Sequence, residues 1–134
     1  MYFFFKFGIP VRCILDREID MLVSGTRHPF WGKYKLYCTR DGMFRSFDLK
    51  MVSNAGHSYD LSRAVMERAM THCDNVYMFP HLKVNGRLAK TNMASNTAFR
   101  GFGGPQGMMI TELMISEVAD KLKMDPIEIR EKKY

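Results

Sequence analysis

Cysteine is scarce in this sequence and long apolar runs are missing from it, and these two shortages exclude several classes of protein. The three cysteines are odd in number and widely spaced, which fits neither a secreted disulfide framework nor a paired zinc motif: Cys13, Cys38 and Cys73. The aromatic run at residues 1–7 is interrupted by Lys6, and it is too short for a membrane span and wrongly built for a signal peptide. We therefore expect a soluble intracellular chain whose cysteines are reduced.

Charge of one sign is not concentrated in any one segment. The 134 residues include 20 Lys and Arg against 14 Asp and Glu, which gives a formal net charge of +6, and 46% of them are hydrophobic. This composition is typical of one globular domain. An excess of cations can attract nucleic acid or anionic membranes, but here the cations run from Lys6 to Lys133 and are mixed with acids. We therefore expect a solvated surface, with neither a nucleic acid nor a membrane as partner.

The first predicted strands are short. Apolar runs at residues 11–15 and 21–23 are typical of strands, and the charged stretch between them suits an exposed turn. Residues 76–84 form a further apolar run, but Pro80 lies within it. Because proline cannot donate a ladder hydrogen bond, this run predicts an edge strand or an extended passage.

The strongest local signal predicts a hairpin. Residues 34–38 and 43–52 are apolar runs on either side of the tetrapeptide Thr-Arg-Asp-Gly at residues 39–42. An Asp-Gly pair between such runs favours a tight turn, because glycine adopts a positive φ without strain. The sequence therefore predicts an antiparallel ribbon that ends between Asn54 and Ser58.

Residues 59–73 have the period of a helix. One face carries apolar residues at steps of three and four, with Arg68 in the middle of them: Leu61, Ala64, Val65 and Ala69. In one interpretation the stem of Arg68 packs along the core, and its guanidinium reaches an acid or water at the rim. In the other, the cation points into a cleft, where its donors hold a carbonyl or a developing oxyanion.

Residues 85–104 form a long predicted loop, rich in Gly, Asn, Ser and Thr, which is followed by helices. Loops of this length are usually functional or disordered, and the phenylalanines within this one argue against disorder. A helix is predicted from Pro105, since a proline N–H is not needed at the first helical position, and Asp125 caps a short charged helix after it. Together the elements predict an α+β fold, in which an antiparallel hairpin or sheet packs with two or three helices.

The stretch from Ser95 to Gly107, SNTAFRGFGGPQG, has the most features that suit a ligand. Its glycines let the backbone approach a ligand closely, and the helix start after it directs N–H groups and a positive dipole end at an anionic or oxo-rich cofactor. Phe102, between glycines, can present its ring to a flat heterocycle. A glycine-rich turn whose two phenylalanines fill the core would explain the same residues.

Two nucleotide-binding motifs do not fit this stretch. Residues 100–103 match the start of an RNA-recognition strand, but Gly104 and Pro105 follow where that motif needs aromatic and β-forming residues. The glycines also fail the dinucleotide fingerprint, whose third glycine would fall on Gln106.

From Pro10 onward the chain resembles the molybdenum-binding part of the xanthine dehydrogenase and aldehyde oxidase family. The blocks that carry the resemblance are spread over most of the chain, and the last is the most specific: residues 10–13, 15–17, 25–30, 66–69, 86–87, 90–92 and 95–106. Only residues 1–9 look foreign. The resemblance therefore implies an atypical segment at 1–9 and, at 10–134, a fragment of the molybdenum-cofactor domain.

The resemblance also implies an activity and roles for individual residues. The family oxidises its substrates at a molybdenum–molybdopterin centre, and the electrons leave through 2Fe-2S clusters and FAD to NAD or oxygen. Arg100 is implied to lie at the molybdenum centre, with Gly101 and Gly103 against the cofactor. Phe102 is implied to stack on the substrate ring. Arg68 is implied to be both catalytic and substrate-binding, since it would hold a substrate oxygen whose negative charge grows in the transition state.

Within the family, Arg68 and the small residue Gly104 favour the purine-oxidising branch, which converts hypoxanthine and xanthine to urate. The general base and the remaining cofactor contacts belong to parts of the family chain that this sequence does not contain, so we expect the isolated chain to be inactive. For the whole protein the resemblance implies a homodimer in the cytoplasm, with the peroxisome as second compartment. An aldehyde oxidase fragment and a small basic RNA-binding module are the alternatives.

Overall fold

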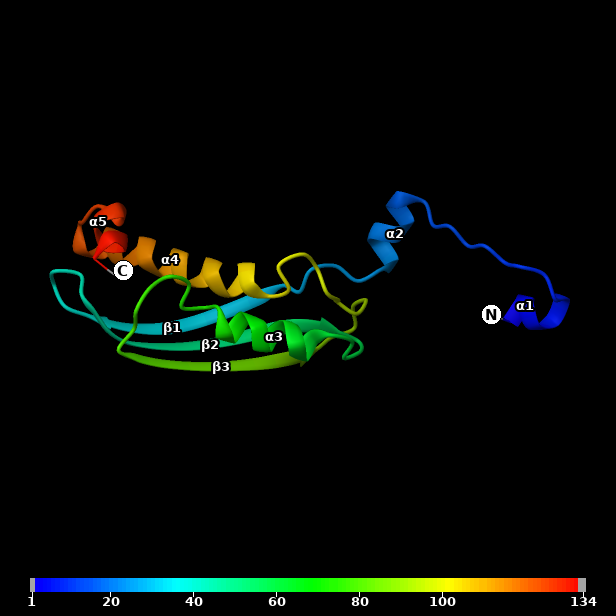
Figure 1. The fold of residues 1–134 in the computed structure, drawn as a ribbon, viewed down its shortest axis with the longest axis horizontal. Coiled ribbons are helices and arrows are strands. Elements are labelled where there is room, and N and C mark those ends of the chain that lie inside the picture. The colour runs from blue at the N-terminus through cyan, green and yellow to red at the C-terminus, as the bar shows by residue number, and fades with distance from the viewer. Residues whose placement is uncertain (1, 133–134) are drawn as a thin grey trace.

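Residues 2–132, which are the residues that the computed structural model describes, contain five helices and three strands (Figure 1). The predicted α+β class is confirmed. In chain order the elements are α1 (Tyr2–Phe7), α2 (Arg17–Val23), β1 (Phe30–Cys38), β2 (Phe44–Gly56), α3 (Ser62–Thr71), β3 (His81–Lys90), α4 (Gly104–Leu122) and α5 (Pro126–Glu131).

The strands form one mixed sheet in the order β1-β2-β3. β1 and β2 are antiparallel, with Tyr34 opposite Leu49, so the predicted hairpin is confirmed. The φ of +86° at Gly42 provides the conformation that its turn needs. β3 instead runs parallel to β2, with Val84 opposite Leu49, because α3 crosses over the sheet and returns the chain in the same direction. The sheet is therefore mixed, and the predicted antiparallel part of it is the β1–β2 hairpin.

β3 is an edge strand, as predicted, but its bounds differ from the predicted residues 76–84, because residues 76–80 lie outside it. It begins directly after Pro80 and continues to Lys90, so residues 85–90 lie in a strand and not in the long loop predicted for them. Within this strand, position 86 needs a glycine because α3 packs closely over it. A Cβ at that position would stand 2.5 Å from the Sδ atom of Met66.

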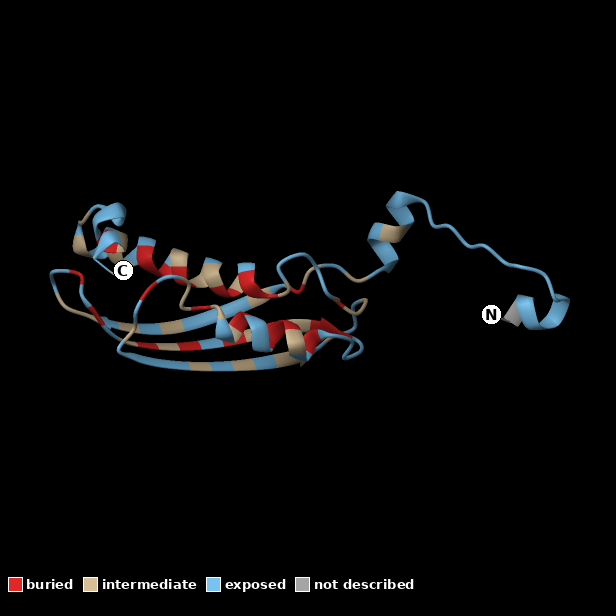
Figure 2. Cartoon of the chain, viewed as in Figure 1, coloured by how far each residue is buried: buried red, intermediate tan, exposed pale blue. Residues whose placement is uncertain are grey.

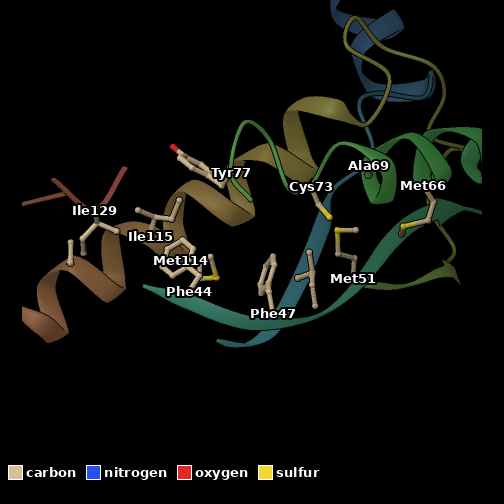
Figure 3. Packing of buried hydrophobic residues seen from close by; sticks show 12 residues of the cluster. Phe44, Phe47, Met51, Met66, Ala69, Cys73, Tyr77, Met114, Ile115 and Ile129 are labelled. Atoms are coloured by element: carbon tan, nitrogen blue, oxygen red, sulfur yellow. The ribbon is translucent and has the colours of Figure 1, made fainter. Parts of the chain in front are cut away.

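α3 and α4 cover one face of the sheet, and α5 folds back at the end of α4 (Figure 1). The side chains between these layers form a single apolar core (Figure 3): Phe44, Phe47, Leu49, Met51, Met66, Ala69, Cys73, Tyr77, Met114, Ile115, Ala119 and Ile129. The helix predicted from Pro105 is confirmed, with Gly104 as its first residue. The predicted cap of α5 is confirmed too, since the Asp125 side chain accepts a hydrogen bond of 2.7 Å from the Ile127 N–H.

The predicted strands at residues 11–15 and 21–23 are wrong. Residues 11–15 are extended but pair with no other strand, and residues 21–23 lie in α2 together with the charged residues predicted as a turn. An apolar run becomes a strand only where a neighbouring strand satisfies its backbone, and here the chain extends away from the sheet (Figure 2). Within the described residues, no helix is both long and apolar enough to cross a membrane.

Candidate functional site

The loop of residues 91–103 connects β3 to α4 and is held by a buried asparagine. Asn96 is only 4% exposed. Its side-chain oxygen accepts hydrogen bonds from the backbone N–H and the hydroxyl of Thr26, at 3.3 and 3.2 Å. Its Nδ2 donates to the backbone carbonyl of Asn54 at 2.9 Å. The loop is therefore fixed both to the end of β2 and to the segment that leads into β1.

Two glycines let the loop lie directly on this support. A Cβ at Gly25 would stand 1.6 Å from the carbonyl oxygen of Ser95. A Cβ at Gly56, whose φ is +81°, would stand 2.3 Å from the carbonyl oxygen of Ala94. Any side chain at either position would push the loop away, so the sequence fixes the position of the loop by backbone contact.

The end of the loop has an unusual backbone. Three successive residues are left-handed, with φ of +90° at Gly101, +49° at Phe102 and +94° at Gly103. The turn is closed by hydrogen bonds from the Phe102 N–H to the Phe99 carbonyl at 2.8 Å and from the Gly104 N–H to the Gly101 carbonyl at 2.9 Å. A left-handed phenylalanine is strained and persists only where the surroundings impose it, which is characteristic of functional turns.

The same turn packs against α3. A Cβ at Gly103 would stand 2.1 Å from the carbonyl oxygen of Val65, and one at Gly107 would stand 2.4 Å from that of Ala69. Arg68 lies between Val65 and Ala69 in the sequence, so the structure brings the backbone of the glycine turn to the helical turn that carries Arg68. α3 and the turn therefore meet here through backbone atoms, and a side chain at Gly103 or Gly107 would push them apart.

Arg68 itself does not lie in the middle of the buried face, so that expectation is wrong. The buried residues of α3 are Ser62, Val65, Met66 and Ala69, and Arg68 is exposed beside them. The face is rotated because Ser62, a polar residue, is buried through a hydrogen bond to His28. Within residues 2–132 no hydrogen bond or ion pair involves the guanidinium of Arg68, which argues against the interpretation that it reaches an acid at the rim.

The phenylalanines of the stretch do not fill the core. Phe99 is exposed and Phe102 is only half-buried, so the interpretation of a core-filling turn is wrong. Arg100 and Gly101 are exposed as well. Among the described residues, the side chains of Arg68, Arg100 and Phe102 make no hydrogen bond or ion pair with one another. Their convergence on one ligand therefore stays a prediction.

Sequence reasoning did not identify His28, which packs beneath the glycine turn through hydrogen bonds to Ser62 and Gln106. His28 is buried, with its Nε2 2.7 Å from the Ser62 hydroxyl. Its backbone carbonyl accepts a hydrogen bond of 3.3 Å from Nε2 of Gln106 in the first turn of α4. Burial lowers the pKa of His28, and this effect outweighs the attraction of Asp60 and a backbone hydrogen bond with Thr97. His28 is therefore a neutral structural residue.

Two polar atoms beside the turn have no partner in the part of the chain that the structure describes. They are Oε1 of Gln106 and Nη1 of Arg27, and both are buried. The guanidinium of Arg27 lies over the ring of Phe99, with 4.6 Å from Cζ to the ring centroid. Buried polar groups normally have hydrogen-bond partners, so an acceptor and a donor without partners at this place are consistent with a ligand that supplies them.

A second polar cluster surrounds Glu112 in the middle of α4. Glu112 accepts hydrogen bonds from the hydroxyl of Tyr77 at 2.6 Å, from Nδ2 of Asn75 at 2.9 Å and from Nε of Arg130 at 3.0 Å. Burial alone would raise the pKa of Glu112, but these three donors lower it below its usual value. Burial and the neighbouring carboxylate raise the pKa of Tyr77 to about 12. This cluster joins α5 and the segment after α3 to α4.

Comparison with known proteins identifies similar chains. The sequence matches the molybdopterin cofactor-binding domain family over residues 3–134. It is 53% identical over 126 residues to the xanthine dehydrogenase/oxidase of Gallus gallus, which covers 94% of this chain and 9% of that protein. It is 55% identical over 122 residues to the xanthine dehydrogenase of Oryza sativa subsp. japonica, which covers 91% of this chain and 9% of that protein. The chain thus spans about a tenth of the length of these relatives. The predicted division at residue 10 stays a prediction.

Solved structures share the fold. The aldehyde oxidoreductase from Desulfovibrio gigas is 29% identical, with a TM-score of 0.76 over 81% of this chain and 12% of that chain. A Cu,Mo-CO dehydrogenase is 25% identical, with a TM-score of 0.82 over 97% of this chain and 17% of that chain. In each case the matched segment is a small part of a larger chain.

Proposed function

Because the chain belongs to the molybdopterin cofactor-binding domain family of oxidoreductases, we propose that it forms part of a xanthine dehydrogenase that hydroxylates hypoxanthine and xanthine to urate. The observation that carries this proposal is the unpaired guanidinium of Arg68, which lies on the helical turn against which Gly103 packs. The identity of more than half of the residues to two xanthine dehydrogenases supports the same substrate class.

The residues present fit the cofactor. In the glycine turn Gly101 is exposed while Gly103 is buried against α3, and the exposed guanidinium of Arg100 has no acid partner in the described part of the chain. The buried Oε1 of Gln106 offers an acceptor, and the start of α4 favours negative charge. Arg100, Gly101 and Gly103 would thus hold the molybdenum–molybdopterin group. When bound, this group supplies the two-electron oxidation of the substrate carbon, and the electrons would pass through 2Fe-2S clusters and FAD elsewhere in the protein to NAD or oxygen.

The remaining roles fall to Arg68 and Phe102. A purine oxygen that gains negative charge during the reaction would accept hydrogen bonds from the guanidinium of Arg68. Phe102, held in a left-handed conformation between two glycines, would offer one ring face to the flat heterocycle. Both contacts bind and orient the substrate, and only the contact of Arg68 grows stronger in the transition state.

A chimeric enzyme tests the proposal. In it, this chain replaces the matching segment of the Gallus gallus xanthine dehydrogenase/oxidase. We expect the chimera to retain molybdenum and to oxidise xanthine. Loss of molybdenum would contradict the role of residues 100–103. Retention of molybdenum together with oxidation of aldehydes alone would contradict the purine assignment and would favour the aldehyde oxidase alternative.

A further inference from the structure

The face of the sheet that the helices leave bare is strongly basic. Side chains alternate between the two faces of a strand, and from Phe47 onward the core residues of β2 occupy odd-numbered positions: Phe47, Leu49 and Met51. The other face therefore presents the even positions of β2 and their neighbours on β1 and β3. Five of these residues are cations, although the basic residues are dispersed along the sequence: Lys33, Lys35, Lys50, Lys83 and Arg87. We call these residues, with Trp31, Asp48, Val52 and Asn85, the basic sheet face.

The cations of this face repel one another. Lys33 lies directly opposite Lys50 in the register of β1 and β2, and like charges in that position destabilise a sheet. Asp48 is the acid of the face and lies beside Lys35 on β1 and Lys83 on β3. In the described residues, no acid lies within ion-pair distance of any of the five cations. The face therefore has an unbalanced positive charge that an acidic partner would neutralise.

The basic sheet face also contains a cavity and an exposed tryptophan. A cavity of about 390 Å³ is lined by residues of all three strands: Trp31, Lys50, Met51, Val52, Lys83, Asn85 and Arg87. Trp31 is 56% exposed and lies opposite Val52. A tryptophan rimmed by cations is typical of a protein interface, in which a large apolar side chain is surrounded by polar groups.

Asp48 distinguishes between the two anionic partners that such a face could bind. Its Oδ1 is buried and has no hydrogen-bond partner within residues 2–132. The phosphate groups of a nucleic acid have acceptor oxygens and no donor to offer it, and their negative charge would be repelled by the carboxylate. A polypeptide can supply carboxylates for the lysines together with an N–H or O–H donor for Asp48. The relatives have most of their length outside the part that this chain matches, so further polypeptide accompanies the matched part in them.

We propose that the basic sheet face docks an acidic polypeptide segment, whose carboxylates pair with the lysines while one of its N–H or O–H groups donates to Asp48. None of these residues belongs to the loop of residues 91–103, so the proposal goes beyond the proposed function and can fail independently of it.

The test uses the single tryptophan of the chain as the probe, since Trp31 lies on the face itself. The 134-residue chain is titrated with a short peptide of alternating Glu and Ser, and in parallel with an oligothymidylate of the same length, while the fluorescence of Trp31 is recorded. We expect a saturable blue shift with the peptide, because a docked segment removes water from the indole. Lys33→Glu and Lys50→Glu should each weaken binding about tenfold, since each adds repulsion to a lost attraction. The matched control is Lys121→Glu on α4, which should bind the peptide as the unchanged chain does.

Circular dichroism verifies that each variant is folded. The proposal is overturned if the peptide leaves Trp31 fluorescence unchanged, or if oligothymidylate binds more tightly than the peptide, which would make the face a nucleic-acid surface. It is also overturned if Lys121→Glu weakens binding as much as Lys50→Glu, because the attraction would then depend on net charge alone.

Discussion

Gly103 lies so close to Val65 that a Cβ on the glycine would stand 2.1 Å from the valine carbonyl oxygen. This contact sets the distance between the glycine turn and α3, and so between Phe102 and the helical turn of Arg68. The site depends on this contact because Phe102 and Arg68, the two proposed substrate-binding residues, lie on the two backbone segments that touch here. Four predictions test how this part of the structure is held, and a fifth tests what it does.

Gly103→Ala should lower the free energy of unfolding by about 2 to 4 kcal/mol, because the new Cβ overlaps α3 and alanine is strained at a φ of +94°. Gly104→Ala is the matched control. A Cβ there meets nothing within 4 Å, so its effect should stay within about 1 kcal/mol. Urea denaturation measures both, and equal effects of the two substitutions would show that the contact with Val65 does not constrain the turn.

Asn96→Ala should lower the free energy of unfolding by about 2 to 3 kcal/mol. It leaves the N–H of Thr26 and the carbonyl of Asn54 without this partner at a partly buried place. Asn92→Ala, at an exposed position of the same loop, is the control and should change little. Hydrogen exchange of the Thr26 amide gives a second measurement, since this amide should exchange faster in the Asn96 variant only. Unchanged exchange would show that Asn96 does not anchor the loop.

The stability of the chain should fall as the pH decreases below about 6.5, with His28 as a contributor. Its pKa in the folded chain is lowered, mainly by burial, from the ordinary value of 6.5. Well above pH 6.5 the residue is neutral whether the chain is folded or not. Below it, the unfolded chain binds a proton that the folded chain resists, so the free energy of unfolding decreases. Urea midpoints between pH 8 and pH 5.5 should fall more steeply for the unchanged chain than for His28→Gln, and equal slopes would contradict this assignment.

Glu112→Ala should destabilise the chain by about 2 kcal/mol, because Tyr77, Asn75 and Arg130 all lose their shared acceptor. Glu67→Ala is the comparison. Glu67 pairs with Arg63 at 2.7 Å, but both side chains are largely exposed, so its loss should cost about 0.5 kcal/mol or less. Thermal unfolding of both variants decides the point. Similar losses would mean that the cluster around Glu112 contributes no more than a surface ion pair.

The elements that the sequence predicts correctly are those with a local cause. The hairpin follows from Gly42, whose positive φ is needed within the turn itself, and the start of α5 follows from Asp125, which caps an N–H two residues ahead. The direction of β3 has no such local cause, since it depends on the packing of α3 over Gly86. The run at residues 11–15 fails for the same reason, because its own pattern does not say whether a partner strand exists.

The candidate site shows the same division. The glycine turn and its phenylalanine stand out in the sequence, because glycine between aromatic residues is a local pattern. The residues that hold the turn do not, since Asn96 bonds to Thr26 across 70 positions and His28 bonds to Ser62 across 34. The second contact also rotates the buried face of α3, which is why the period of that helix was predicted correctly and the position of Arg68 was not.

The most direct test of the proposed function compares Arg68→Ala with Arg63→Ala in the chimeric enzyme, with xanthine and a simple aldehyde as substrates. Arg63 lies on the same helix and is exposed, but it is paired with Glu67, so it serves as the control. We predict that Arg68→Ala lowers kcat/KM for xanthine by about 100-fold or more while the aldehyde reaction changes only a few-fold, because the lost donor faces charge that develops on the purine oxygen. Equal losses on both substrates, or no loss on xanthine, would contradict the account.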